Sequence, residues 1–316
     1  MNGLELAKGY FEEFGKPMLE SGFSDILPFL AAGFTGSGSE HYGFDDEVSR
    51  DHDFEPGFCI FLPDESVVDR KRAFQLERAY AGLPQEYNGV KRQRISPVGG
   101  NRNGVIRTSD FYMKSIGSAN GQLSAMQWLR LPDYVLAEAV NGEVFFDNYG
   151  EFSRIREELI CMPEDIKLKR LAGNLFIMAQ SGQYNFVRCL KHGEPEAAQL
   201  ACVEFVNAAM KTAFLLQDRY MPYYKWSFRA LRGLFGSKEL SEKLSFLLFG
   251  DNCDAAAAGQ KYDIIESIAS DTIEQLKERD LTSSICGDLE KHAYSVNDRI
   301  SDGTIRNMSI MIAVGD

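Results

Sequence analysis

The fold of this 316-residue chain is decided by one stretch, Gly36-Ser-Gly-Ser-Glu-His-Tyr-Gly-Phe-Asp-Asp-Glu-Val-Ser-Arg-Asp-His-Asp53. An apolar run, residues 26–34, precedes it, and the segment that follows Asp53 ends in a second apolar run before Pro63. Both runs are short and favour β structure, so the sequence predicts a strand before the stretch and another after it. A Gly/Ser turn and a pair of carboxylates therefore stand between two predicted strands.

The residue types in this stretch suit the binding of phosphate and metal. A glycine such as Gly38 lets the backbone approach a ligand closely, and turn N–H groups together with the Ser39 hydroxyl can hold phosphate oxygens. Asp51 and Asp53 are two residues apart, which on a strand places both carboxylates on one side at roughly 7 Å. Two such carboxylates suit a Mg²⁺ ion shared with substrate phosphates. His52 would face the other way, where packing or a supporting hydrogen bond is expected.

Apolar spacing predicts the remaining elements in outline. Helices are expected at residues 3–21, 64–82, 109–117 and 122–131, and a short strand at residues 105–108. Residues 83–104 are polar and rich in Gly, Pro and Asn, which is typical of a long loop. Residues 132–161 are expected to form a helix, a short strand at residues 143–147 and a second helix.

A domain boundary is predicted near Met162-Pro163-Glu164, because the pattern beyond it is wholly helical. The tail adds further helices, with residues 255–258 as a small-residue helix or turn. We therefore expect an α+β chain with two domains. Residues 1–162 would form a mixed sheet with helices, and residues 163–316 an all-helical domain for binding a substrate or partner.

Charge is unevenly distributed along the chain. The formal net charge of -12 argues against a general nucleic-acid surface, which needs clustered Lys and Arg. Residues 40–55 hold seven acids against one base, Arg50, whereas residues 66–107 hold nine bases against three acids. An acidic cluster followed by a basic stretch suits a metal ion beside an anionic ligand. The basic stretch alone is better explained as a solvated face.

The cysteines and the N-terminus bear on localisation. Six scattered cysteines form no C-x-x-C pair, and several lie in apolar runs, so they are interpreted as reduced core residues of a cytoplasmic protein. The first twenty residues are amphipathic and carry acids, unlike a signal or transit peptide. No uninterrupted apolar stretch approaches the length of a transmembrane helix, so no membrane association is expected.

The stretch resembles the signature of the nucleotidyltransferase (polymerase-β-like) superfamily, in which Gly-Ser is followed after about a dozen residues by Asp-x-Asp. Here Gly38-Ser39 is followed by eleven residues and then Asp51-His-Asp53. Together with the later Pro222-Tyr-Tyr-Lys-Trp226, the segment from Gly36 is similar to the DUF4037 family. That family pairs such a domain with a helical C-terminal domain, somewhat as in kanamycin nucleotidyltransferase.

The resemblance implies a defined chemistry. Gly38 and Ser39 would bind the β- and γ-phosphates of a nucleoside triphosphate, most simply ATP. Asp51 and Asp53 would hold one or two Mg²⁺ ions, which activate an acceptor hydroxyl for attack on the α-phosphate and release pyrophosphate. Positioning and electrostatics would supply most of the rate.

Active members of the superfamily carry a third carboxylate on a later strand, and here its identity is open. The predicted strand at 105–108 contains no acid. Asp110, just after it, is the first choice, and Glu143 is the second. Lys225, among the aromatic residues of the later motif, would reach the triphosphate or, as is usual for a helical lysine, stay solvated.

Three functions follow from these alternatives. The first is transfer of a nucleotide to a hydroxyl of a small molecule. The second is the same transfer to a protein or RNA acceptor, which the acidic balance disfavours for RNA. The third is a non-catalytic nucleotide-binding module, favoured if neither Asp110 nor Glu143 reaches the metal. The sequence contains no matching P-loop, dinucleotide fingerprint, H-E-x-x-H or nucleophile-elbow motif that would favour another class.

Overall fold

The computed structural model describes residues 1–48, 54–92 and 103–314. The chain divides into two compact units. Unit 1 comprises residues 1–122 and 135–161, and unit 2 comprises residues 123–134 and 162–316. Each unit is described by itself below.

Unit 1 contains a four-stranded mixed sheet with the order β5-β2-β1-β6. The strands are β1 (Ala31–Phe34), β2 (Cys59–Leu62), β5 (Gly104–Arg107) and β6 (Glu143–Asp147). Strand β1 runs antiparallel to β2 and β6, and β2 runs parallel to β5. The carboxyl end of β1 therefore meets the amino ends of the other three strands at one edge of the sheet. The prediction of an α+β chain with a mixed sheet is confirmed.

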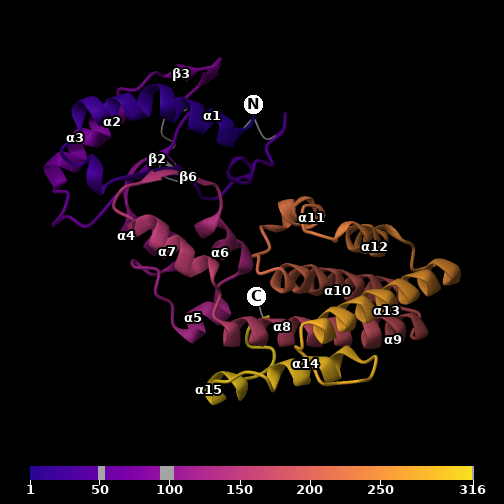
Figure 1. Cartoon of the computed structure of the whole chain (residues 1–316). Helices are drawn as coiled ribbons and strands as arrows, with labels where there is room; N and C mark the ends of the chain where they lie inside the picture. Colours follow the sequence, from indigo (N-terminus) through magenta and orange to yellow (C-terminus); the bar gives the residue numbers. More distant parts are fainter. Residues whose placement is uncertain (49–53, 93–102, 315–316) are drawn as a thin grey trace. The chain divides into compact units, whose positions relative to one another are not determined.

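One face of the sheet is covered by the N-terminal helices and α3 (Figure 1). Residues 3–22 form one continuous helical segment of α1 (Gly3–Tyr10), a π-helical turn η1 (Phe11–Gly15) and α2 (Lys16–Gly22), as the apolar spacing predicted. Helix α3 (Arg70–Ala81) is shorter than predicted and starts at an Asp69 cap, whose side chain accepts the Arg72 N–H. Aromatic and aliphatic side chains from these helices and the strands form the core of this face.

The opposite face of the sheet packs on helices α4 (Thr108–Ile116), α6 (Asp133–Val140) and α7 (Glu151–Ile160) (Figure 1). Phe61 of β2 stacks on Phe152 of α7, with ring centroids 3.8 Å apart, and meets Phe111 of α4 edge-on at 5.3 Å. These aromatic contacts fix α4 and α7 against the sheet.

The prediction of one long loop at residues 83–104 is wrong for residues 86–91. They form a hairpin of β3 (Glu86–Tyr87) and β4 (Val90–Lys91). Asn88 and Gly89 supply the turn with φ of 50° and 78°, the left-handed pair that two-residue hairpin turns require. Residues 93–102, including Arg94 and Arg102 of the basic stretch at residues 66–107, lie outside the described residues.

In the part of unit 2 that the structure describes, the regular elements are helical. They are α5 (Ala125–Arg130), α8 (Glu164–Met178), a π-helical segment η5 (Ala179–Phe186), α9 (Val187–Lys191), α10 (Pro195–Leu216), α11 (Tyr224–Arg232), α12 (Lys238–Phe249), α13 (Ala255–Glu278), α14 (Leu289–Asn297) and α15 (Gly303–Arg306). Helices α8 and α10 form the centre of the unit, where α14 packs on α8 and α12 on α10. Residues 255–258 are the first turn of α13, capped by Asp254.

Helix α10 is long and apolar enough to pass as a membrane span by length and composition. Its apolar window is 61% buried inside unit 2, as the central helix of a bundle would be.

The burial of the cysteines agrees only in part with the interpretation from the sequence. All six are unpaired, but only Cys59 and Cys202 are buried. The prediction of core positions is wrong for Cys161, Cys253 and Cys286, which are exposed.

Candidate functional site

The Gly/Ser turn follows β1 directly and lies at the shared edge of the unit 1 sheet. Gly36 and Gly38 have φ of 136° and 125°, conformations that L side chains rarely adopt. A Cβ at Gly38 would lie 2.2 Å from the Glu40 carboxylate, which would have to move, and the positive φ would strain any side chain there. Ser39 is buried and begins a short 3₁₀ helix, Ser39–Tyr42. Gly38 and Ser39 thus form a tight, defined turn, as their chemistry requires.

Asn141, in the loop between α6 and β6, holds this turn in place. Its side-chain oxygen accepts the Gly36 N–H and the Thr35 hydroxyl, both at 3.0 Å, while its amide nitrogen donates to the Gly36 carbonyl at 2.7 Å. One side chain thereby satisfies both backbone polar groups of Gly36. Asn141 was not predicted from the sequence.

Asn141 is itself held by its neighbours. Arg156 of α7 donates to the Asn141 carbonyl at 2.5 Å and to the Gly142 carbonyl at 3.2 Å. Burial lowers the pKa of the Arg156 guanidinium from its usual value, but the group stays charged because an arginine pKa begins so high. Gly142 turns the chain into β6 with φ of 68°. The local signal for this turn was the Asn-Gly pair.

Replacing Asn141 with leucine is expected to lower the free energy of unfolding of unit 1 by about 2 kcal/mol, because Thr35 and Gly36 would keep unpaired polar groups. Urea unfolding of unit 1 would measure the change. Asn148→Leu is the matched control, since its exposed amide donates a single bond, to the Leu27 carbonyl. Equal losses in the two variants would contradict a special role for Asn141.

A cavity of about 350 Å³ lies beside this turn within unit 1. The turn and the first residues of β2 and β5 form one wall, and α4 and α6 form the other. Its lining residues are Thr35, Gly36, Ser37, His41, Cys59, Asn103, Gly104, Val105, Ile106, Phe111, Lys114, Ser115, Val135 and Glu138. The volume is at the lower end of the ~300–1,000 Å³ typical of small-molecule sites.

The walls of the cavity combine apolar and polar groups. Lys114 and Glu138 are its two formally charged residues among those described, apart from the titratable His41. The His41 ring stacks on Phe34 at 4.1 Å, and its Nδ1 lies 3.4 Å from a Glu40 carboxylate oxygen. Burial raises the pKa of the Cys59 thiol to about 12, so this group is neutral at pH 7 and a poor nucleophile or metal ligand.

The other predicted site residues are placed as follows. Asp51 and Asp53 lie outside the described residues. Asp110 is exposed in the first turn of α4 and does not line the cavity. Glu143 lies at the shared edge of the sheet, paired with Phe34 in register, but its carboxylate forms an ion pair with Lys8. Among the described residues, no three His, Cys, Asp or Glu side chains are grouped as a metal site.

Lys225, the predicted phosphate contact from the helical region, is exposed on α11 of unit 2. The neighbouring aromatic residues contact each other within the unit: Tyr223 meets Tyr224 at 4.4 Å and Tyr134 at 5.5 Å.

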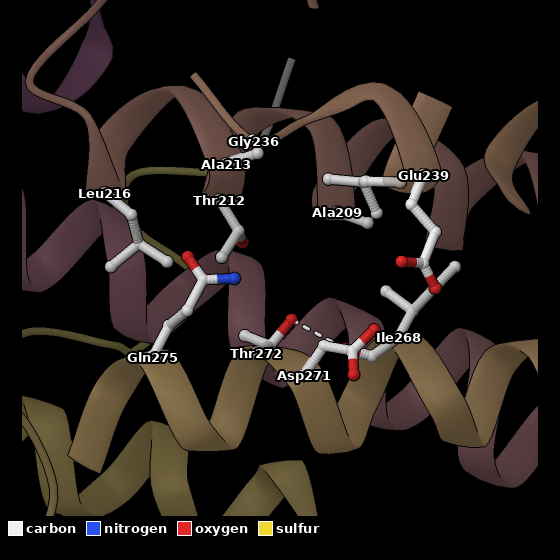
Figure 2. Close-up of a pocket in the computed structure, with 11 residues that line it drawn as sticks. Ala209, Thr212, Ala213, Leu216, Gly236, Glu239, Ile268, Asp271, Thr272 and Gln275 are labelled. Carbon is white, nitrogen blue, oxygen red and sulfur yellow. Dashed lines mark hydrogen bonds between the residues drawn. The ribbon is translucent and has the colours of Figure 1, made fainter. Parts of the chain in front are cut away.

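Unit 2 has a hollow of its own, of about 250 Å³, between α10, α12 and α13 (Figure 2). Ala209, Thr212, Glu239 and Asp271 are among the residues that line it. Both carboxylates are already paired with Lys243, at 2.8 and 2.7 Å. The charged groups of this hollow therefore serve the packing of the bundle, and the unit 1 cavity is the better candidate.

A protein-family model matches residues 128–227, about a third of the chain. The match is to DUF4037, a domain of unknown function. It covers Asn141, Glu143 and Lys225 but not the Gly36–Ser39 turn or Asp51 and Asp53. No curated protein and no solved structure matches the chain.

Proposed function

We propose that unit 1 is a nucleotidyltransferase-type domain. In this function the Gly36–Ser39 turn binds the phosphates of a nucleoside triphosphate, most simply ATP. Asp51 and Asp53 hold Mg²⁺, and the nucleoside monophosphate passes to a hydroxyl of a small acceptor with release of pyrophosphate. The metal supplies charge neutralisation at the phosphates, and the chain supplies positioning.

The observation that carries the proposal is the convergence at one edge of the sheet. The rigid turn after β1, the start of β2 and the start of β5 all border the same cavity. Glu55 is connected to this wall, because its carboxylate accepts a hydrogen bond from Asn103 at 3.2 Å. Asp53, which lies outside the described residues, stands two residues before Glu55 in the sequence.

The size of the cavity favours a small-molecule acceptor over a nucleic acid. A nucleic-acid acceptor also needs a basic surface, which the acidic balance of the chain disfavours.

The test is nucleotide binding in the presence and absence of Mg²⁺. We expect the wild type to bind ATP with Mg²⁺, and the double variant Asp51→Asn, Asp53→Asn to lose at least about tenfold in affinity, since two metal-binding charges are removed. Titration calorimetry measures both. Pyrophosphate release, with water or added alcohols as acceptors, then separates an enzyme from a binding module.

The matched control is Glu20→Gln with Glu77→Gln, which removes two exposed carboxylates from α2 and α3 of the same unit. This control should bind as the wild type does. Unchanged Mg²⁺-dependent binding in the Asp51, Asp53 variant would overturn the metal assignment.

A further inference from the structure

The connection between α11 and α12 of unit 2 exposes a phenylalanine to solvent (Figure 1). We call residues 232–238 the α11–α12 corner. Phe235 stands between Gly233 and Gly236 in the sequence, and its side chain is 94% exposed. Single exposed apolar side chains are common on protein surfaces, so the surroundings of Phe235 decide whether this one has a role.

The α11–α12 corner keeps the backbone of Phe235 in a fixed position. Gln217, the residue after α10, binds both of its polar groups: the amide nitrogen of Gln217 donates to the Phe235 carbonyl at 2.9 Å, and the amide oxygen accepts the Phe235 N–H at 3.2 Å. The N–H groups of Leu234 and Ser237 donate to the carbonyls of Leu231 and Leu234, at 3.0 and 3.3 Å. The backbone at Phe235 therefore needs no water as a hydrogen-bond partner, which is the condition for entering an apolar layer.

Positively charged side chains surround this phenylalanine. Residues 219–238 hold five bases and no acid, in a chain whose formal net charge is -12. Arg232 and Lys238 are exposed, and each stands three residues from Phe235, a span of at most about 11 Å. Arg219 is exposed as well, and it follows the glutamine that binds Phe235 by two positions. The phenylalanine thus lies among bases.

The acids that flank residues 219–238 do not cancel these charges. Asp218 pairs with Lys167 at 2.7 Å, and Glu239 pairs with Lys243 at 2.8 Å. Within the part of the chain that the structure describes, neither Arg232 nor Lys238 forms an ion pair. The α11–α12 corner therefore presents uncompensated positive charge, which complements an anionic partner.

The chemistry of the α11–α12 corner favours a phospholipid surface over a nucleic acid. An apolar side chain whose backbone is already hydrogen-bonded can enter the interfacial layer of a bilayer, while neighbouring bases meet the lipid phosphates. A nucleic acid would instead use free backbone N–H groups for phosphates and base edges, and Gln217 already occupies the polar groups of Phe235. Such a contact is peripheral and needs no membrane-spanning helix.

We propose that the α11–α12 corner docks on a surface of anionic phospholipid. Phe235 enters the interfacial layer, and Arg219, Arg232 and Lys238 bind lipid phosphates. The contact is reversible, because one apolar side chain and three bases each contribute a modest factor to the affinity. This inference goes beyond the proposed nucleotidyl transfer and does not depend on it.

The test is co-sedimentation of the full chain with vesicles of phosphatidylcholine mixed with phosphatidylserine, compared with vesicles of phosphatidylcholine alone. Wild type should bind the mixed vesicles more tightly and lose this preference at high salt, which screens the charges. Phe235→Ser should weaken binding by about tenfold, because the apolar contact is lost. Arg232→Gln with Lys238→Gln should weaken it by at least about tenfold, since each base near an anionic surface contributes about fivefold.

Unit 2 offers a matched control for each variant. Phe249 is 88% exposed, but it lies at the far end of α12, two residues before Asp251, so Phe249→Ser should bind as the wild type does. Lys277→Gln with Lys291→Gln removes two exposed bases outside residues 219–238 and should also leave binding unchanged.

A second measurement keeps the proposal testable if Phe235→Ser disturbs folding. Phe235→Trp should be quenched by brominated phospholipid in mixed vesicles, whereas Phe249→Trp should be quenched no more than the wild type. No binding of wild type to the mixed vesicles, equal weakening by Phe235→Ser and Phe249→Ser, or equal quenching of the two tryptophan variants would overturn the proposal. Binding of single-stranded RNA without binding of vesicles would assign the bases to a nucleic acid and overturn it as well.

Discussion

Arg170→Leu is expected to lower the free energy of unfolding of unit 2 by about 3–5 kcal/mol, the usual loss when one partner of a buried ion pair is removed. The Arg170 side chain, on α8, is only 4% exposed and pairs with Asp133, which is 10% exposed. Its guanidinium also donates to the carbonyls of Trp128 and Leu131. Leucine would leave a buried carboxylate without its counter-ion and two carbonyls without these donors. The residues that depend on Arg170 all belong to segment 123–134.

Tryptophan fluorescence during urea unfolding measures this effect, because both tryptophans of the chain, Trp128 and Trp226, lie in unit 2. Arg299→Leu is the matched control: it also removes an arginine ion pair from unit 2, but Asp280, its partner, is 89% exposed. Arg299→Leu should therefore lower the free energy of unfolding of unit 2 by less than about 1 kcal/mol. If the two variants lost similar stability, Arg170 would not be what fixes segment 123–134 to α8.

Most of the sheet was predictable because each strand is a short apolar run with turn residues at its ends. The prediction was too long at residues 26–34. Pro28 has no N–H and a fixed φ, so it favours the short 3₁₀ helix Leu27–Phe29, and β1 begins only at Ala31. Local chemistry also predicted a close turn at Gly38, whose φ of 125° favours glycine, whereas phosphate binding by Gly38 and Ser39 stays a prediction. The Asn88-Gly89 pair was an equally local signal for the hairpin. The polar composition of the surrounding residues favoured a long loop instead.

The supporting residues of the candidate site were not predictable in the same way. Asn141 bonds to Gly36 across 105 positions of sequence, and Asn103 bonds to Glu55 across 48. Each asparagine precedes a glycine, a pair that marks a turn but not its partner, and each acquires its role only when β6 or β5 joins the sheet. The third carboxylate met the same limit. Asp110 was preferred because it follows the predicted strand at 105–108, and Glu143 because it lies on the later short strand. The cavity wall instead presents Asn103 at a strand boundary and Glu138 on a helix face.

Gly142→Ala is expected to lower the free energy of unfolding of unit 1 by at least about 3 kcal/mol, from two separate causes. The residue has φ of 68°, which costs an L side chain about 1–2 kcal/mol. An added Cβ would also lie 1.9 Å from the Phe34 carbonyl oxygen and 2.9 Å from its carbon, so β1 and β6 must separate to admit it. That separation would displace Asn141 and release the Gly36 turn. Labelling of the buried Cys59 thiol against urea concentration reports this unfolding.

Gly150→Ala separates the two causes. Gly150 has φ of 80°, but a Cβ there would meet no atom within 4 Å. Only the backbone conformation disfavours alanine at this position, so Gly150→Ala should lower the free energy of unfolding by about 1–2 kcal/mol. The difference between the two variants is the contribution of the close approach between Gly142 and Phe34. Equal losses would mean that the strands at this edge separate without cost, and the Gly36 turn would then be much less rigid than its hydrogen bonds to Asn141 indicate. ATP affinity should fall in Gly142→Ala and stay unchanged in Gly150→Ala, because only the first change reaches the turn that is proposed to bind the phosphates.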